Sequence, residues 1–189
     1  MRPTPTAPGS DTGFSLVETL VALAILTLAI AGPLGVASQS VTYALNAKDQ
    51  MAAVYLAQEA MEAVRNIRDS NRLDADQSAW LTGAAEDLAE CAGIDCGVNI
   101  AVSGGVPSIS IAPCTSWLSG DCTLYYHGAS GLYNHDNSGA ATSFVRTVRI
   151  GSPIGGNTDE ASVVGTVTWR TRPHLPLRTV MVREHLFNW

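Results

Sequence analysis

Basic residues are scarce in this chain of 189 residues. Lys and Arg together number 11 against 17 Asp and Glu, which gives a net charge of −6. A protein that binds the phosphate backbone of nucleic acid needs a surplus of Lys and Arg to displace counterions. The composition therefore does not support a nucleic-acid partner, although a net charge carries no information about a local basic patch.

The common catalytic motifs are also missing. The sequence has no HExxH, GxSxG, P-loop or Gly-rich dinucleotide fingerprint. His135 and Asp136 could form a metal or acid–base pair, but the Asp, Asn, Ser and Gly around them favour a turn. The other histidines are scattered through predicted loops and strands: His127, His174 and His185. We therefore predict that the protein is not an enzyme and has no catalytic residue, metal site or cofactor.

Charge is absent altogether from the stretch Leu20–Ala37. These 18 residues carry one hydroxyl, that of Thr27. A run of this length can span a bilayer as a helix. The alternative is a buried core helix, but a continuous apolar run so close to the N-terminus favours a membrane segment.

Three kinds of membrane segment fit this run. A conventional signal peptide would be cut after Val36-Ala37-Ser38, which leaves Gln39 as the first mature residue. A signal anchor would stay uncut. The third kind is cut before the apolar run.

Residues 13–26 read GFSLVETLVALAIL. This sequence resembles the N-terminal cleavage and methylation motif of type IV pilins and type II secretion pseudopilins. The resemblance implies that a prepilin peptidase cuts after Gly13 and methylates Phe14. It also implies partners: other pilin subunits in a helical filament and an inner-membrane assembly platform. The leader MRPTPTAPGSDTG departs from the short basic leaders of the family, because its single Arg2 is opposed by Asp11, which weakens the cue for membrane orientation.

Glu18 is the informative residue of the motif. A carboxylate costs about 2.5–3.5 kcal/mol at the bilayer centre, and less near the edge. Lys48, the next cation along the chain, is about eight helical turns away. Glu18 could simply lie at the interface and favour the helix start through the dipole. Alternatively, cleavage after Gly13 creates an α-amino group on Phe14, and this group on a neighbouring subunit could neutralise Glu18. The resemblance implies the same assembly role.

Gly32 and Pro33 interrupt the apolar segment with a predicted helix break. Proline removes a backbone donor and clashes with the preceding turn. The result is either a simple kink or a segment that loosens when the subunit leaves the bilayer for a filament. The resemblance favours the second interpretation, because pilins often carry a helix breaker in this region.

Helical spacing continues beyond this break to about Arg68. An apolar stripe recurs at steps of three, four and seven residues, at Leu45, Ala52, Leu56, Ala60, Ala63 and Ile67. Glu62–Arg65 and Arg65–Asp69 are spaced to pair on the exposed side. A helix from Phe14 to Arg68 would be roughly 80 Å long, more than twice a bilayer core. Its second half must therefore pack outside the membrane, and a small β-domain fits better than a coiled coil.

The pattern changes after Asn71, where Gly, Ser, Thr and Asn rise. Alternating apolar residues predict strands around 98–102, 144–150, 163–170 and 177–187. Arg146 breaks the apolar face of the second of these. A short helix at Ala84–Cys91 and a turn at 172–176 complete the prediction, together with an antiparallel sheet of about four to six strands.

All four cysteines lie outside the predicted membrane helix: Cys91, Cys96, Cys114 and Cys122. An even count in an exported domain suggests two disulfides. Three connectivities are possible, and we favour Cys91–Cys96 with Cys114–Cys122 because both close short local loops. A zinc site is the alternative, but the spacings miss the usual ribbon pattern.

The sequence thus predicts an α+β fold, in which a long N-terminal helix, membrane-spanning in its first half and amphipathic in its second, packs on a small antiparallel sheet. The expected segments are a leader (1–13), a transmembrane and assembly helix (14–37), its amphipathic continuation (38–71) and an exported β-rich domain (72–189). The expected function is that of a filament subunit, a minor pilin or pseudopilin. The subunit would be a single-pass membrane protein before assembly, with its C-terminal domain outside the cytoplasm. The alternative is a secreted or membrane-anchored ligand-binding β-domain.

Overall fold

The computed structural model describes residues 13–73, 80–83, 86–103, 105–117, 121–151, 159–172 and 175–188. The chain divides into two compact units, Met1–Ala44 and Leu45–Trp189. Parts of three predicted segments lie outside the described residues: the leader 1–12, the start of the helix predicted at Ala84–Cys91, and the middle of the turn at 172–176.

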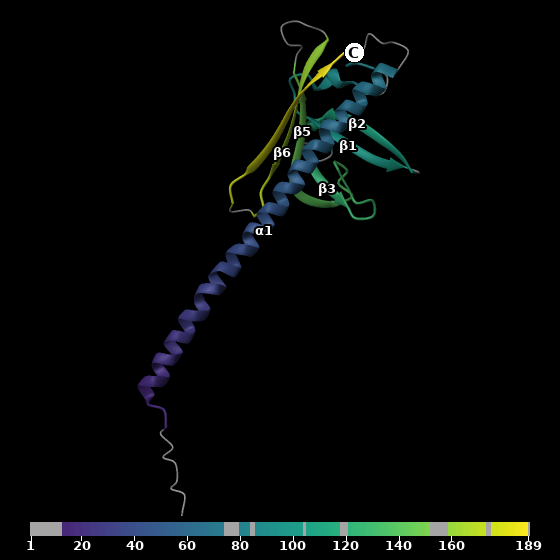
Figure 1. Ribbon diagram of the computed structural model, residues 1–189. Coiled ribbons are helices and arrows are strands. Elements are labelled where there is room, and N and C mark those ends of the chain that lie inside the picture. Colours follow the sequence, from purple (N-terminus) through teal and green to yellow (C-terminus); the bar gives the residue numbers. More distant parts are fainter. Residues whose placement is uncertain are drawn as a thin grey trace, which may run out of the picture. The chain divides into compact units, whose positions relative to one another are not determined.

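The chain folds as one long helix followed by a set of antiparallel strands, as the sequence predicted (Figure 1). Helix α1 covers Leu16–Leu73 and ends about one turn later than expected. The elements that follow are η1 (Leu88–Cys91), β1 (Cys96–Ser103), β2 (Val106–Pro113), η2 (Cys114–Ser116), β3 (Thr123–His127), β4 (Leu132–Asn134), β5 (Ala140–Ile150), β6 (Glu160–Trp169) and β7 (Arg178–Phe187). Of the predicted short helix, the described part is the single 3-10 turn η1.

The described strands form one sheet of seven, which is larger than the predicted four to six. Strand β5 is its centre: β6 pairs along one edge, and β1 and β3 share the other. Strand β7 extends the sheet beyond β6, β2 lies outside β1, and β4 lies outside β3. All these pairings are antiparallel. Strand β4, with three residues, is too short to show the alternation on which sequence-based strand prediction depends.

The second part of α1, from Leu45 onward, packs on the inner face of this sheet (Figure 1). The predicted stripe is confirmed at Leu56, Ala60, Ala63 and Ile67, which are all buried, whereas Leu45 is exposed. Alanines on this stripe allow a close approach of helix and sheet. On the sheet side, Gly165 of β6 also allows this close approach, because a Cβ there would lie 3.0 Å from the Met61 sulfur.

Strict alternation along β5 and β6 separates an inner and an outer face. In β6 the inner residues are all buried and alternate with half-buried ones. Buried side chains form two clusters between α1 and the sheet, one around Val64, Leu88 and Val148 and one around Ala57, Leu124 and Trp169. Burial of this apolar surface, at about 25 cal/mol per Å², is what holds the helix on the sheet.

Arg146 does not break the inner face of β5 but lies fully buried within it. Its Nη1 lies 3.2 Å from a carboxylate oxygen of Glu59 on α1. Its Nη2 donates to the Val98 carbonyl of β1 at 2.7 Å. Burial lowers the pKa of Arg146, and Glu59 acts in the opposite direction. The arginine therefore ties helix α1 to two strands, which its spacing in the sequence could not indicate.

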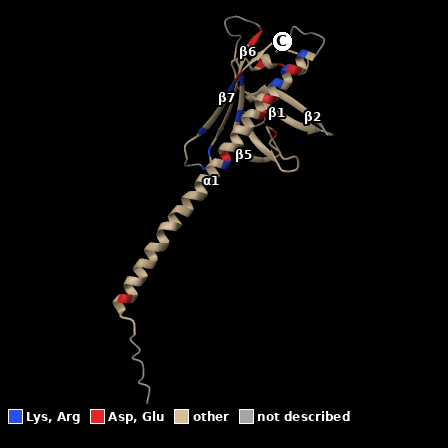
Figure 2. Ribbon diagram, in the orientation of Figure 1, with Lys and Arg blue, Asp and Glu red and all other residues tan. Residues whose placement is uncertain are grey.

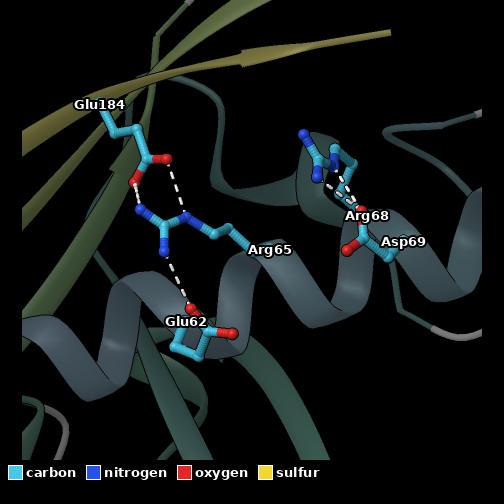
Figure 3. Close-up of polar contacts among 5 residues, drawn as sticks. All are labelled: Glu62, Arg65, Arg68, Asp69 and Glu184. Carbon is cyan, nitrogen blue, oxygen red and sulfur yellow. Dashed lines mark hydrogen bonds and ion pairs between the residues drawn. The ribbon is translucent and has the colours of Figure 1, made fainter. Parts of the chain in front are cut away.

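A second cation, Arg65, connects α1 to β7 (Figure 3). Its guanidinium donates through Nε and Nη2 to the two carboxylate oxygens of Glu184, each at 2.7 Å. The predicted pair with Glu62 is confirmed at 2.9 Å. The predicted pair of Arg65 with Asp69 is wrong, because Asp69 binds the adjacent Arg68 instead. The bonds from Glu184 first, and from Glu62 second, raise the pKa of Arg65.

Candidate processing and assembly site

The Gly13–Phe14 peptide bond lies before the first turn of α1. Residues 13–15 have no regular secondary structure, and Phe14 is 83% exposed. Ser15 caps the helix: its hydroxyl accepts the Val17 amide at 3.2 Å and its carbonyl accepts the Thr19 amide at 3.2 Å. No atom approaches within 4 Å of the position that a Gly13 Cβ would take. The bond therefore lies outside the regular helix.

Glu18 lies in the first turn of α1, where the helix dipole favours a carboxylate. It has no ion-pair partner within the part of the chain that the structure describes. Residues 19–47 carry no charge at all, so this section of the ribbon in Figure 2 lacks both charge colours. The arrangement is a single carboxylate at the start of a long uncharged helix.

The apolar section of α1 exposes its side chains on every side. All residues from Gly13 to Val41 are exposed, among them Leu20, Leu23, Ile25 and Leu34. Four hydroxyls in and just after this section are satisfied locally: those of Thr19, Thr27, Ser38 and Thr42 donate to backbone carbonyls three or four residues earlier. Such internal satisfaction is what a helix in hydrocarbon requires.

By length and composition, α1 is the one helix among the described residues that can cross a membrane. Its most apolar window of 18 residues has a mean hydropathy of 2.3, and none of that window is buried in the protein. The core helix of a soluble protein passes the same length test but is mostly buried. The segment is therefore consistent with a membrane-anchored prepilin.

Gly32 and Pro33 both lie within α1, which the structure carries through them as helix. Pro33 has no amide proton, so the carbonyl of Ala29 lacks its usual donor. The glycines beside it have open surroundings: nothing lies within 4 Å of a Cβ at Gly32 or Gly35. The predicted helix break at Gly32 and Pro33 therefore stays a prediction.

The four cysteines form two disulfides in the β-domain. Cys91 is bonded to Cys96, and Cys114 to Cys122. This is the pairing that the sequence analysis favoured. The first bond ties η1 to the start of β1, and the second links η2 to the residue before β3.

His135 lies in the turn region after β4 but is buried, with 1% of its surface exposed. Its ring lies 4.9 Å from the Trp117 ring, and its Nδ1 is 3.1 Å from the Thr123 carbonyl. Burial lowers the pKa of His135 to about 4, and Arg146 adds to this effect. The predicted turn follows at Asp136, whose carboxylate accepts the Ser138 amide at 3.1 Å and hydroxyl at 2.8 Å.

The remaining described histidines do not form a cluster with His135. His127 contacts the Asp136 carbonyl at 3.0 Å, and His185 contacts Glu160 at 2.8 Å. No group of three or more His, Cys, Asp or Glu side chains within the described ranges could hold a metal ion.

Two polar residues of α1 were missed by the sequence reasoning. Glu59 pairs with buried Arg146. Asn71 is fully buried, and its amide donates to the Glu86 carbonyl at 2.9 Å. Gly83 allows this contact, because any Cβ there would clash with the Asn71 side chain. Asn71 lies one helical turn beyond Ile67 and so continues the apolar stripe, a positional signal that could have revealed its burial.

Comparison with known proteins supports the N-terminal assignment. Residues 10–32 match the model of the prokaryotic N-terminal methylation motif, which is characteristic of type IV pilins and type II secretion pseudopilins. No curated protein and no solved structure matches the chain. The protein thus combines a prepilin-type N-terminus with a pilin-like α+β fold. The motif implies processing by a prepilin peptidase, and pilin-like proteins are typically structural and not enzymes.

Proposed function

We propose that the protein is a minor pilin or pseudopilin that enters a helical filament through the first part of α1. The proposal is carried by one observation: within the matched motif, a lone carboxylate, Glu18, begins a long, exposed and uncharged helix. A carboxylate in such a setting is costly unless a cation reaches it. Cleavage after Gly13 would create that cation as the methylated α-amino group of Phe14 on a neighbouring subunit.

The segment boundaries follow from this proposal. Residues 1–13 are the leader, 14–37 the transmembrane and assembly helix, 38–71 its amphipathic continuation, and 72–189 the exported domain. Before assembly the subunit is held in the membrane, with the exported domain outside the cytoplasm. Its partners are the prepilin peptidase, the inner-membrane assembly platform and other subunits, and the filament lies at the surface or in the periplasm.

The position of the competing cleavage site supports the prepilin route. A signal peptidase would cut between Ser38 and Gln39, a bond inside α1, whereas the Gly13–Phe14 bond precedes the helix. Peptidases bind extended backbone. The Gly13–Phe14 bond is therefore available without local unfolding, whereas the Ser38–Gln39 bond is not.

Mass spectrometry of the mature N-terminus tests the proposal. Membrane and extracellular fractions should contain a chain that begins with N-methylated Phe14. A chain that begins at Gln39 would identify a conventional signal peptide, and an uncut chain would identify an anchor. Either outcome would instead support a secreted or anchored ligand-binding β-domain. Deletion of the gene, followed by electron microscopy for surface filaments, tests the assembly role separately.

A further inference from the structure

The outer face of strands β5, β6 and β7 gathers arginines that are dispersed in the sequence. Strand register places Arg149, Val164 and Arg183 in one row across the three strands. Thr147, Thr166 and Met181 form the next row. Two surface hollows that share Val145 and Thr168 continue the face to Arg170 and Arg172. We name this surface, from Arg149 and Arg183 to Arg170 and Arg172, the arginine face.

The charge of this face is opposite to that of the whole protein. It holds four of the 11 basic residues of a chain whose net charge is −6. Within the described residues that line the two hollows there is a single carboxylate, that of Asp95, which lies 2.9 Å from Arg149. Arg183 is exposed and has no ion pair among the described residues. Glu160, the first residue of β6, is paired with His185 of β7.

The spacing of these arginines suits a polyanion with regular charges. Arg149 and Arg183 are two strands apart, about 10 Å at the backbone. Arg170, the residue after β6, is six residues along the chain from Val164 in that row, roughly 20 Å away in extended backbone. The grooves of B-DNA are about 6 and 12 Å wide between phosphate backbones. A pair of arginines 10 Å apart can reach phosphates on both sides of a groove.

The side-chain chemistry also fits phosphate. Arginine donates two parallel hydrogen bonds to a phosphate, which lysine cannot do, and every cation of the face is an arginine. Thr147, Thr166 and Thr168 supply hydroxyls of the kind that bind phosphate oxygens. No aromatic side chain lines the described hollows, so unpaired bases would find no stacking surface. A duplex is therefore favoured over a single strand.

We propose that the arginine face binds the phosphate backbone of double-stranded DNA without reading its sequence. The net charge predicted no such partner, because it averages a basic face with an acidic remainder. The proposal rests on the proposed function to the extent that filament assembly would present this face outside the cytoplasm. Binding can be measured without assembly, so failure here leaves the N-terminal mass test unaffected.

The test uses the full mature chain in a non-ionic detergent and a short fluorescent DNA duplex, with fluorescence anisotropy as the readout. Non-specific binding in the range of about 10⁻⁶–10⁻⁴ M is expected, with a slope of log K against log salt of about −3, from about 0.9 per phosphate contact for about three contacts in the wild type. Arg183→Ala should weaken binding about two- to five-fold and reduce the slope by about 1.

Two further variants make the test specific. Asp95→Asn should tighten binding, because it releases Arg149 and removes the only carboxylate in the described lining. Arg178→Ala is the matched control: Arg178 is exposed on the same strand as Arg183 but has the opposite parity, so duplex binding should not change. Circular dichroism melting curves should show that all three variants fold.

Four outcomes would overturn the proposal. The first is no duplex binding by the wild type, and the second is binding that Arg183→Ala and Arg178→Ala weaken equally. The third is binding to single-stranded DNA, polyglutamate or anionic phospholipid vesicles that matches the duplex in affinity and salt slope. Salt-dependent self-association through the same arginines, measured by sedimentation, would assign the face to a second copy of this chain instead.

Discussion

The two parts of α1 are built from one continuous helix but follow opposite rules. From Leu16 to Ala44 the helix buries nothing and carries one charge, Glu18, at its start. From Leu45 to Leu73 it buries a stripe of small and apolar residues and arranges charges toward the sheet, as Glu59 and Arg65 show. A helix can therefore be apolar for two reasons. The first part has no packing partner among the residues that the structure describes, whereas the second part packs on the sheet.

The largest expected effect concerns the first part. Glu18→Val should be processed and inserted normally but should enter filaments at least about tenfold less, because the variant would lose the proposed ion pair with the Phe14 amine of a neighbouring subunit in a low-dielectric setting. The measurement is the amount of variant in sheared filaments relative to the membrane fraction. Thr19→Val is the control, since that hydroxyl bonds only within its own helix. Equal incorporation of both variants would refute the assembly role of Glu18.

The second part of the helix should depend on a different carboxylate. Glu59→Gln leaves Arg146 buried without its counter-charge, and we expect a loss of about 3 kcal/mol in the free energy of unfolding of the β-domain. The double variant Glu59→Leu/Arg146→Met should recover most of that loss, because it replaces the pair by apolar packing. Urea denaturation followed by near-ultraviolet circular dichroism measures both. If Glu59→Gln were as stable as the wild type, the Glu59–Arg146 pair would not contribute to the stability of the β-domain.

Acid should destabilise the β-domain and leave the apolar section of α1 unaffected. The pKa of His135 is about 4 in the folded protein, below the value of about 6.5 expected in the unfolded chain. The unfolded state therefore binds the proton first, and stability falls as the pH drops from about 6.5 to 4, by up to about 3 kcal/mol. This loss of stability affects the β-domain. The circular dichroism signal of the helical apolar segment should not change.

A nuclear magnetic resonance titration of the His135 ring checks this prediction directly. His135→Gln should flatten the stability curve between pH 6.5 and 4 relative to the wild type. A His135 ring that titrates near its ordinary pKa would show that the side chain is solvated, contrary to its burial.

The smallest expected effect concerns the surface of the second part. Arg65→Met should cost at most about 1 kcal/mol, because the guanidinium is 43% exposed and water screens its pairs. Glu62→Gln should cost less still, since that carboxylate is 72% exposed. Thermal melting at low and high salt measures the difference, which should shrink as salt rises. A loss above about 2 kcal/mol in the free energy of unfolding for Arg65→Met would show that Arg65 contributes like the buried Arg146 and not like a surface ion pair.

Much of the candidate site could be predicted because it is local in the sequence. Gly13, Phe14 and Glu18 lie within six residues, and the apolar run follows at once. The strands at 160–169 and 178–187 were also predictable, since alternation over ten residues is a strong signal. The burial of Arg146 and His135 was not, because each depends on partners more than ten residues away, such as Glu59 and Thr123.

By itself, the sequence determined the processing motif, the apolar helix and the alternation of the strands, all of which depend on neighbours along the chain. Only the tertiary structure decided what lies across the sheet: the buried Arg146 on the inner face and the row of Arg149 and Arg183 on the outer face. The physical reason is strand register. Register brings residues far apart in sequence within 5–10 Å of one another, and no local pattern of the sequence records it.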